Sequence, residues 1–402
     1  MKSEQTKSIL HPKSLGILAI LAITSSLTSV SIDLLAPALP ILSKAFDDSS
    51  GSMKLTIHAF YLGFGFAHIF WGSLSDRYGR RVIMLTGLVL YCAATLACLS
   101  ASSLEILLIF RSLQGIGAAV GMILGRAIIR DIYGPQRATQ AVATMFMFFV
   151  PVPILAPLVS GYVVSYFNWQ IIFWIMEIIA LSALAIIATL LMETAPLKLE
   201  RTSHVERYVH DLGLILSHRF FLRKAFTNMF CFATFVMFIS NFSYIMTSQF
   251  AFTPQQNGQI LSLISCCLAI GVLLVRKLVP LLGVQRTIFS GIYLLTACWS
   301  IILILQLLDI QALIYYMVPI FICSFGSGIV LSLLPGQAMV PFSSNAGAAS
   351  SVFGILQYGG SALLADLSGI FYQTTALSVS VAITLCAGLT LFSYWFLDEP
   401  AE

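Results

Sequence analysis

Twelve apolar runs, each long enough to cross a lipid bilayer as a helix, follow one another through this chain. A spanning helix needs about 20 apolar residues, because the hydrocarbon core of a bilayer is about 30 Å thick. Only 9% of the residues are charged, whereas a soluble domain carries about 25% to solvate its surface. We therefore predict an all-α polytopic membrane protein with twelve transmembrane helices. The runs lie at 15–39, 53–73, 82–101, 104–126, 138–164, 168–192, 224–248, 257–280, 287–307, 312–335, 345–372 and 375–396.

One long polar stretch, 193–223, divides the runs into two groups of six. We expect residues 1–192 and 224–402 to form two six-helix bundles, joined by 193–223 as a solvated linker. His204, His210 and His218 lie in this linker, so a metal site is the alternative interpretation there. The first run is longer than the roughly 7–15 apolar residues of a signal peptide, so we expect it to be retained as a helix.

A weak internal repeat supports two related halves. The segment from Gly79 to Gly87 resembles the segment from Gly283 to Gly291, and the two are offset by close to half the chain. A duplicated six-helix unit explains that offset. We therefore predict two pseudo-repeated bundles.

The positions of Lys and Arg predict the orientation, since basic loops stay on the cytoplasmic side. Most basic residues lie in the N-terminal segment and in the loops after the second, fourth, sixth and eighth runs, whereas the loops on the other side hold only Lys44 and Lys54. Both termini are therefore expected in the cytoplasm.

Several classes of function lack their sequence signals. The basic residues form no stripe interleaved with exposed aromatics, so no nucleic-acid partner is expected. The eight cysteines all lie inside apolar runs, without CxxC or CxxH spacing, and we interpret them as packing residues. No GxxxxGK[ST], HExxH or GxSxG is present, so we predict neither ATP binding, a metal, a cofactor nor an enzymatic activity.

The loop after the second run carries the most specific motif, Gly72-Ser-Leu-Ser-Asp76-Arg77-Tyr-Gly79-Arg80-Arg81. It resembles the GxLaDrxGrr signature of the major facilitator superfamily. Glycine permits a tight turn, and the charges can bridge elements that separate during transport. Topology and folding alone are the alternative role for these charges.

Further segments resemble the Bcr/CflA group of drug:proton antiporters. Arg111-Ser-Leu-Gln-Gly115-Ile-Gly117 is similar to the RxxqGxg motif, and Ala156-Pro157-Leu-Val-Ser160-Gly161 to the antiporter motif GPxxGG with two glycines replaced. The other matching segments are Asp33-Leu-Leu-Ala-Pro37-Ala-Leu-Pro40, Arg130-Asp131-Ile-Tyr133, Asn168-Trp169-Gln-Ile-Ile-Phe173-Trp174 and Asn345-Ala-Gly347 through Gln357.

The resemblance implies proton-coupled export of small organic compounds across a bacterial inner membrane, by alternating access to a cavity lined by helices 1, 4, 7 and 10. The expected partners are the substrate, protons and the lipid bilayer, and the expected state is a monomer. A dedicated exporter of an endogenous metabolite, such as a siderophore, is the first alternative, and a membrane sensor without transport is the second.

Ionisable residues at membrane depth are costly and are therefore functional candidates. Asp33 and Arg111 lie about 9 and 10 Å from the outer ends of their runs, by the helical rise per residue, and could meet across the cavity. We expect Asp33 to accept the proton and the cationic substrate, and Arg111 to modulate it; a static ion pair between the two helices is the alternative. Glu177 and Asp366 are further possible coupling residues; the alternatives are a polar helix contact for Glu177 and an interfacial position for Asp366.

The resemblance also assigns a gate at the cytoplasmic side. Arg80 is expected to contact Asp131, and Asp76 to face the start of helix 11, where a helix N-terminus attracts negative charge. We expect these contacts to stabilise the outward-facing state. The polar and aromatic residues expected to line the cavity are Tyr61, Asn241, Tyr244, Tyr315 and Gln357.

Overall fold

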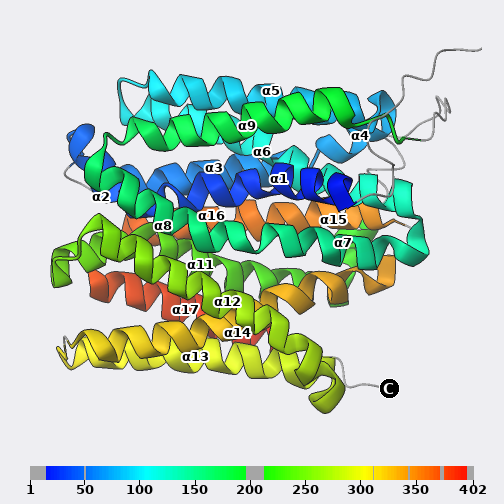
Figure 1. Cartoon of the computed structure of the whole chain (residues 1–402). Coiled ribbons are helices and arrows are strands. Elements are labelled where there is room, and N and C mark those ends of the chain that lie inside the picture. Colours follow the sequence, from blue (N-terminus) through cyan, green and yellow to red (C-terminus); the bar gives the residue numbers. More distant parts are fainter. Residues whose placement is uncertain are drawn as a thin grey trace, which may run out of the picture.

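The computed structural model describes residues 15–48, 51–195, 212–310, 312–342, 345–371 and 375–395, and these residues form helices without strands. Eleven of the helical segments are long and apolar enough to cross a membrane. Figure 1 shows them running side by side across the view, with α4 near one end and α2 near the other. The all-α membrane fold predicted from the sequence is confirmed.

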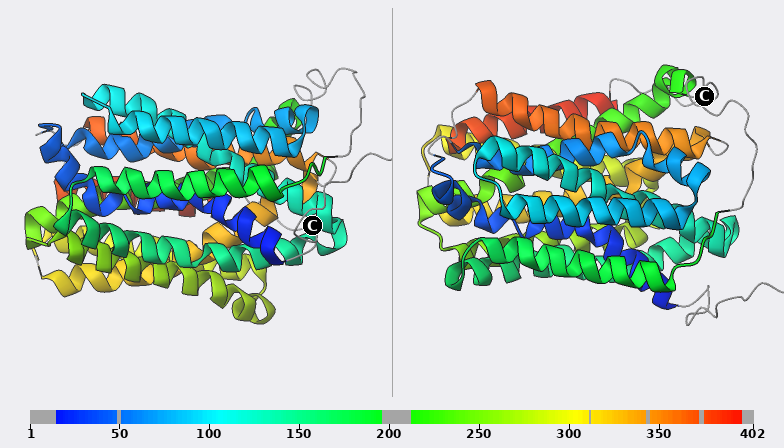
Figure 2. Two further views of the ribbon diagram at one scale, coloured as in Figure 1. Left: turned by 45° about the horizontal axis from the view of Figure 1, so that its top comes forward. Right: turned by 90° about the horizontal axis from the view of Figure 1, so that it is seen from above.

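The helices before residue 193 pack mainly on one another, and so do those after residue 212. Figures 1 and 2 show the two sets lying against each other along their length. The first set is α1 (Leu15–Asp33), η1 (Ala36–Ala38), α2 (Leu39–Ala45), η2 (Ser52–Lys54), α3 (Leu55–Ala67), α4 (Trp71–Tyr78), α5 (Arg80–Leu99), α6 (Leu104–Tyr133), α7 (Pro135–Phe149), α8 (Pro151–Tyr166) and α9 (Gln170–Leu190).

The second set contains two interrupted segments as well as continuous helices. It consists of α11 (Arg219–Phe250), α12 (Pro254–Leu282), α13 (Val284–Leu307), α14 (Leu313–Met339), η3 (Val340–Phe342), α15 (Ala346–Gly354), η4 (Ile355–Gly360, a π-helix), α16 (Ser361–Phe371) and α17 (Ala376–Trp395). Together α15, η4 and α16 occupy the eleventh predicted run.

The second predicted run, 53–73, is two helices instead of one, which corrects the sequence prediction. The Nδ1 atom of the His68 ring lies 2.9 Å from the carbonyl oxygen of Phe64. In a continuous α-helix this carbonyl oxygen would accept the hydrogen bond of the His68 amide, so the ring takes the place of that amide. The following amide groups bond three residues back, as from His68 to Gly65 and from Ile69 to Phe66. The helix therefore tightens and ends at Ala67, and α4 begins at Trp71.

The weak sequence repeat corresponds to a repeated structure. Gly79 and Gly283 both have positive φ, 99° and 79°, and each precedes a helix, α5 and α13. Eight residues later, Gly87 packs on Val120 of α6 and Gly291 packs on Gly326 of α14. The two halves thus use the same turn and the same close helix pair, as a duplication predicts.

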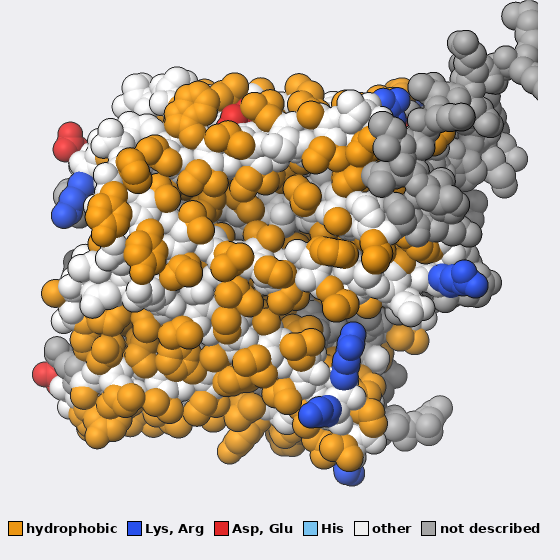
Figure 3. All heavy atoms as spheres, in the orientation of Figure 1, with side chains coloured by type: hydrophobic (Ala, Val, Ile, Leu, Met, Phe, Trp, Pro, Cys, Tyr) orange, Lys and Arg blue, Asp and Glu red, His pale blue; other side chains and the backbone are white. Residues whose placement is uncertain are grey.

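The outer surface is apolar along most of its length, as contact with lipid requires. Large apolar side chains such as Phe66, Tyr166 and Leu281 are 57%, 73% and 78% exposed. Figure 3 shows hydrophobic side chains covering the middle of the visible face, with most Lys and Arg near the ends. The end that carries α4 and the loops after α6 and α12 is called here the α4 end, and the opposite one the α2 end.

Only part of the predicted linker lies within the described residues. His204 and His210 fall outside them. The His218 side chain accepts a hydrogen bond from the Phe221 amide and caps α11, and its ring packs on Phe342. The described residues contain no group of three metal-ligating side chains.

Candidate functional site

Asp33 is the last residue of α1, and the helix ends there because of the prolines that follow. Pro37 has no amide hydrogen to donate to the Asp33 carbonyl, so the ladder stops and η1 follows. The freed Leu34 carbonyl accepts a hydrogen bond from Ser160 of α8. Asp33 itself is 5% exposed and accepts a hydrogen bond from Ser29, one turn back. A buried carboxyl therefore lies at a break in the first helix.

Arg111 on α6 is fully buried and reaches two other helices. Its guanidinium donates to the carbonyl oxygens of Thr56 on α3, at 3.2 Å, and Ser31 on α1, at 3.0 Å. It also donates to Gln114 at 2.5 Å and lies 4.8 Å from the centre of the Phe60 ring. Backbone dipoles and a π-face thus replace a carboxylate partner.

Asp33 and Arg111 do not form the ion pair that the sequence suggested. The described ion pairs within 4.0 Å join His58 to Asp366 and Arg80 to Asp76 and Asp131, and none includes Arg111. The carbonyl oxygens of Ser31 and Thr56 occupy the Arg111 donors that a carboxylate would need. The two charges still share a neighbour, because both act electrostatically on the Tyr61 hydroxyl.

Aromatic rings fill the boundary between the two sets of helices beside this pair. Tyr61 of α3 is 5% exposed and packs edge-on against Phe232 of α11, with ring centres 5.4 Å apart. It stacks on Tyr358 of η4 at 6.1 Å, and Tyr358 stacks on His68 at 5.5 Å. Tyr61, expected to line an open cavity, is therefore packed between the halves.

The π-helix η4 lies at this boundary. A π-turn carries one extra residue per turn and is frequent at functional sites. It places Gln357, half-buried, next to Tyr358, whose hydroxyl lies 3.4 Å from the Met122 sulfur of α6. Across from it, Gly65 of α3 approaches Gly359 so closely that a Cβ would lie 2.5 Å from the Gly359 nitrogen. The eleventh segment is therefore in backbone contact with the second.

The loop motif forms a compact charged cluster at the α4 end. Arg80 is 6% exposed, and its guanidinium lies 2.6 Å from Asp76 and 3.1 Å from Asp131. Gly79 makes the turn with φ of 99°. Arg77 lies over the Tyr78 ring, and Gly72 has no neighbouring atom where a Cβ would project. The expected contact between Arg80 and Asp131 is thus present.

Glu193, which belongs to none of the sequence motifs, completes this cluster. Its carboxylate accepts hydrogen bonds from the Arg80 and Arg81 amides, at 2.8 and 3.2 Å. An acidic side chain at a helix N-terminus is favourable, and α5 begins here. Arg81 donates to the Ala188 carbonyl at 2.6 Å. The signal that could have identified Glu193 is its place directly after the sixth run.

Asp76 does not contact the eleventh segment among the described residues. Its bonding partner is Arg80 within the same loop, and its side chain is 67% exposed. The contact between Asp76 and the start of helix 11, expected for the outward-facing state, is therefore not made in this arrangement.

Pro157 and Gly161 of the antiporter-like motif form the contact between α8 and α12. A Cβ on Gly161 would lie 2.6 Å from the Pro254 carbonyl, and one on Gly258 would collide with the Pro157 carbonyl. Ser262 of α12 donates to the Ile154 carbonyl at 2.5 Å. Small residues therefore let the two backbones touch across the halves.

Three further polar contacts join the halves toward the α2 end. Tyr244 of α11 donates to the Leu39 carbonyl at 3.3 Å, and the Lys54 ammonium lies 3.5 Å from the Asn241 side-chain oxygen. Asp366 of α16 lies 2.5 Å from the His58 ring of α3. His58 could not be predicted as part of the site, because a single histidine in an apolar run has no motif around it.

Glu177 is buried in the first set of helices rather than at the boundary. It is 1% exposed on α9, and neither carboxylate oxygen makes a satisfactory hydrogen bond among the described residues. Its polar neighbour is the Cys92 thiol of α5, a weak donor. Glu177 therefore does not share the environment of Asp33.

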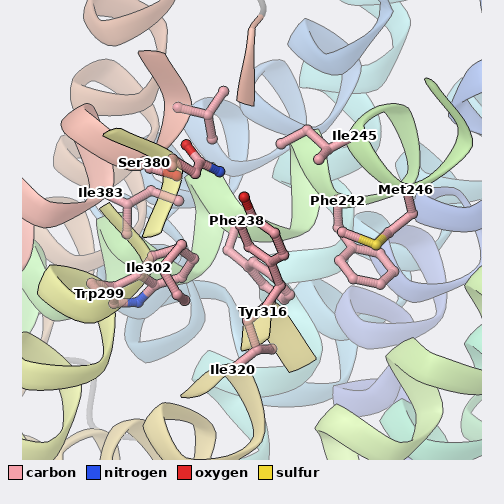
Figure 4. Close-up of a pocket in the computed structure, with 12 residues that line it drawn as sticks. Phe238, Phe242, Ile245, Met246, Trp299, Ile302, Tyr316, Ile320, Ser380 and Ile383 are labelled. Carbon is pink, nitrogen blue, oxygen red and sulfur yellow. The ribbon is translucent and has the colours of Figure 1, made fainter. Parts of the chain in front are cut away.

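A mainly apolar pocket opens inside the second set of helices, among α11, α13, α14 and α17 (Figure 4). Phe238, Phe242, Trp299 and Tyr316 bring their rings into it. Tyr315, expected to line a cavity, is instead 53% exposed, and its neighbour Tyr316 is 5% exposed. Consecutive residues of a helix point about 100° apart, so Tyr315 and Tyr316 lie on different faces of α14. The sequence did not indicate which of the two faces the interior.

Comparisons with known proteins agree on one family. The family model of the Major Facilitator Superfamily matches residues 21–365. The chain is 22% identical to a bicyclomycin resistance protein homolog of Haemophilus influenzae, over 94% of this chain and 95% of that protein. It is 24% identical to multidrug resistance protein D of Escherichia coli, over 95% of each.

Solved structures share the fold at low sequence identity. The POT family transporter PepTSo superposes with a TM-score of 0.74 at 13% identity, covering 96% of this chain and 97% of that one. The human organic anion transporter MFSD10 gives 0.67 at 18% identity, covering 95% and 99%.

Proposed function

The chain belongs to the major facilitator superfamily, and we propose that it is a proton-coupled transporter that exports small organic compounds by alternating access. The names of its relatives, bicyclomycin resistance and multidrug resistance, support export of foreign compounds. The observation that carries the proposal is the buried Asp33 at the break of α1, beside the aromatic boundary between the halves.

Asp33 is proposed to carry the coupled proton. Desolvation favours the neutral form of a carboxylic acid, whereas hydration or a bound cation favours the charged form. Water reaching Asp33 from one side and then from the other would let it load and release a proton in turn. Arg111, held by carbonyl oxygens of Ser31 and Thr56, is proposed to set the local field without neutralising Asp33.

The α4 end is proposed to face the cytoplasm, with both chain termini on that side. The basic residues support this orientation, since Arg77, Arg80, Arg81, Arg276 and Lys277 gather at this end. We propose 1–192 and 224–402 as the two bundles that rock against each other, with 193–223 as their linker, in a monomer. The contacts toward the α2 end then hold the outer side closed in this arrangement.

The loop cluster is proposed as the gate of the opposite state. Opening at the α2 end brings the α4 ends of the halves together, so the exposed Asp76 side chain can then reach the N-terminus of the eleventh segment. We expect Asp76→Asn to lower the transport rate about fivefold, since losing one charge–dipole contact of about 1 kcal/mol shifts the equilibrium by about that factor. Transport at the wild-type rate would contradict this role; Asp47→Asn, at the α2 end, is the control.

Transport itself is tested in inside-out membrane vesicles that contain the protein. With an imposed pH gradient, acid inside, we expect accumulation of a cationic fluorescent drug such as ethidium, and its release when a protonophore collapses the gradient. Accumulation that survives the protonophore, or that needs ATP, would contradict proton coupling.

A further inference from the structure

A second arginine of α6 lies on the α4 side of the aromatic rings at the boundary. Arg126 is exposed, and it comes seven residues before the helix ends at Tyr133. The helical rise of about 1.5 Å per residue places it about 10 Å from that end, and about 22 Å along α6 from Arg111. Arg126 therefore does not share the environment of Asp33 and Arg111.

The preceding turn of α6 shows which way the Arg126 side chain points. Met122 lies four residues before Arg126, so the two side chains project from the same side of the helix. The Tyr358 hydroxyl of η4, in the second set of helices, lies 3.4 Å from the Met122 sulfur. Arg126 also acts electrostatically on Tyr358 and on His68, whose rings stack at 5.5 Å. The guanidinium is therefore at the boundary between the halves, near these stacked rings.

Arg126 is not neutralised by a carboxylate in the described part of the chain, where none of the ion pairs includes it. Asp131, the next acidic residue along α6, is bound by Arg80 at 3.1 Å. The donors of Arg111 are taken by carbonyl oxygens of other helices, whereas Arg126 is exposed and open to a solute. Charged residues of membrane helices that face the interior of the bundle commonly mark substrate pathways.

The chemistry of these neighbours limits which solute would fit. A guanidinium binds a carboxylate through two parallel hydrogen bonds, because its planar fork matches the two oxygens. The Tyr358 ring is half-buried, so part of it remains open to an aromatic group. A planar aromatic compound with a carboxylate can therefore contact both Arg126 and Tyr358. A compound with a cationic group alone gains nothing from Arg126.

We propose that Arg126 and Tyr358 form an entry site, on the α4 side of the transporter, for aromatic compounds that carry a carboxylate. This inference rests on the proposed export function and narrows its substrate class. The carboxylate binds the Arg126 guanidinium while the aromatic part lies on the Tyr358 ring. Asp33, deeper along the boundary, is left to exchange the coupled proton. A zwitterionic aromatic compound contacts Arg126 first and Asp33 afterwards.

The test compares two dyes that differ in one group. Rhodamine 110 carries a carboxylate, and rhodamine 123 is its methyl ester, with the same planar rings and the same delocalised cation. Their binding to the purified protein in a neutral detergent is followed by fluorescence anisotropy at neutral pH. We expect Arg126→Gln to weaken the binding of rhodamine 110 about tenfold and that of rhodamine 123 less than about twofold, because only the carboxylate loses charge-assisted hydrogen bonds.

Further variants separate the charge, its geometry and the ring. Arg126→Lys keeps the charge but not the planar fork, and should weaken rhodamine 110 binding about threefold. The matched control is Arg276→Gln, which removes an exposed arginine at the same end of the protein and should bind both dyes as the wild type does. Tyr358→Leu should weaken both dyes alike, about fivefold, whereas Tyr358→Phe keeps the ring and should not.

Equal weakening of the two dyes by Arg126→Gln would overturn the site, as would unchanged rhodamine 110 binding in that variant or in Tyr358→Leu. A wild type that does not bind rhodamine 110 would also overturn it. The proposed function fails in a different way. Vesicles without proton-driven accumulation of ethidium would contradict proton-coupled export, whereas a selective loss of rhodamine 110 binding in Arg126→Gln would leave the carboxylate site standing.

Discussion

Arg111 shows how one buried charge is accommodated at membrane depth. A guanidinium without a carboxylate within 4.0 Å is stable only if its donors are used, and here two carbonyl oxygens and one amide oxygen accept them. The planar fork of arginine reaches three directions at once, which the tetrahedral ammonium of lysine cannot reproduce. Arg111 thereby joins α1, α3 and α6.

Replacing the Arg111 guanidinium should destabilise the first half of the protein. We expect Arg111→Lys to lower the free energy of unfolding by about 3 kcal/mol, because charge-assisted hydrogen bonds are lost and a buried cation remains. Thermal unfolding of the purified protein in detergent measures the change. Arg130→Lys, an exposed position on the same helix, should unfold like the wild type. Equal stability of the two variants would contradict the account of Arg111.

The sequence could predict which residues are buried charges, but not what surrounds them. Asp33 and Arg111 stand out because apolar runs contain few ionisable groups, and the loop motif predicted the contact of Arg80 with Asp131. Two of the partners of Arg111 are backbone carbonyl oxygens, which every residue has, so the sequence could not identify them. The link from His58 to Asp366 joins residues 308 positions apart, and no local pattern encodes such a distance.

Helices of this protein end or break where a backbone hydrogen bond is removed. Pro37 ends α1 after Asp33, Pro151 separates α8 from α7, and the His68 ring takes the Phe64 carbonyl at the end of α3. Apolar runs predict where a segment crosses the membrane, because hydropathy sums over many residues. They do not resolve single breaks, so the second run was predicted as one helix.

Close helix packing between the halves depends on glycine. We expect Gly258→Ala to lower the free energy of unfolding by about 2 kcal/mol and to slow transport, because its Cβ would collide with the Pro157 carbonyl. The control is Gly336→Ala on α14, where no atom lies within 4 Å of the added carbon. Alanine there should be neutral or stabilise the helix by about 0.5–1 kcal/mol. A harmless Gly258→Ala would contradict the backbone contact of α8 with α12.

At the scale of the whole molecule, the repeat and the boundary between the halves indicate a protein built from two similar parts. Both halves begin a helix with a positive-φ glycine followed by a close glycine contact. Their boundary holds the aromatic rings of Tyr61, Phe232 and Tyr358, with Asp33 on one side and the contact of His58 with Asp366 toward the α2 end. In the proposed cycle, Asp33 exchanges the coupled proton and the loop cluster biases which end is open.

The proton carried by Asp33 is the central claim, and proton uptake by vesicles on addition of a transported compound tests it most directly. Purified protein is reconstituted with a pH-sensitive dye, and the proton flux driven by a compound that the wild type transports is compared among variants. We expect Asp33→Asn to abolish this flux, and Asp47→Asn to keep the wild-type flux. Undiminished substrate-driven proton flux in Asp33→Asn would contradict the account.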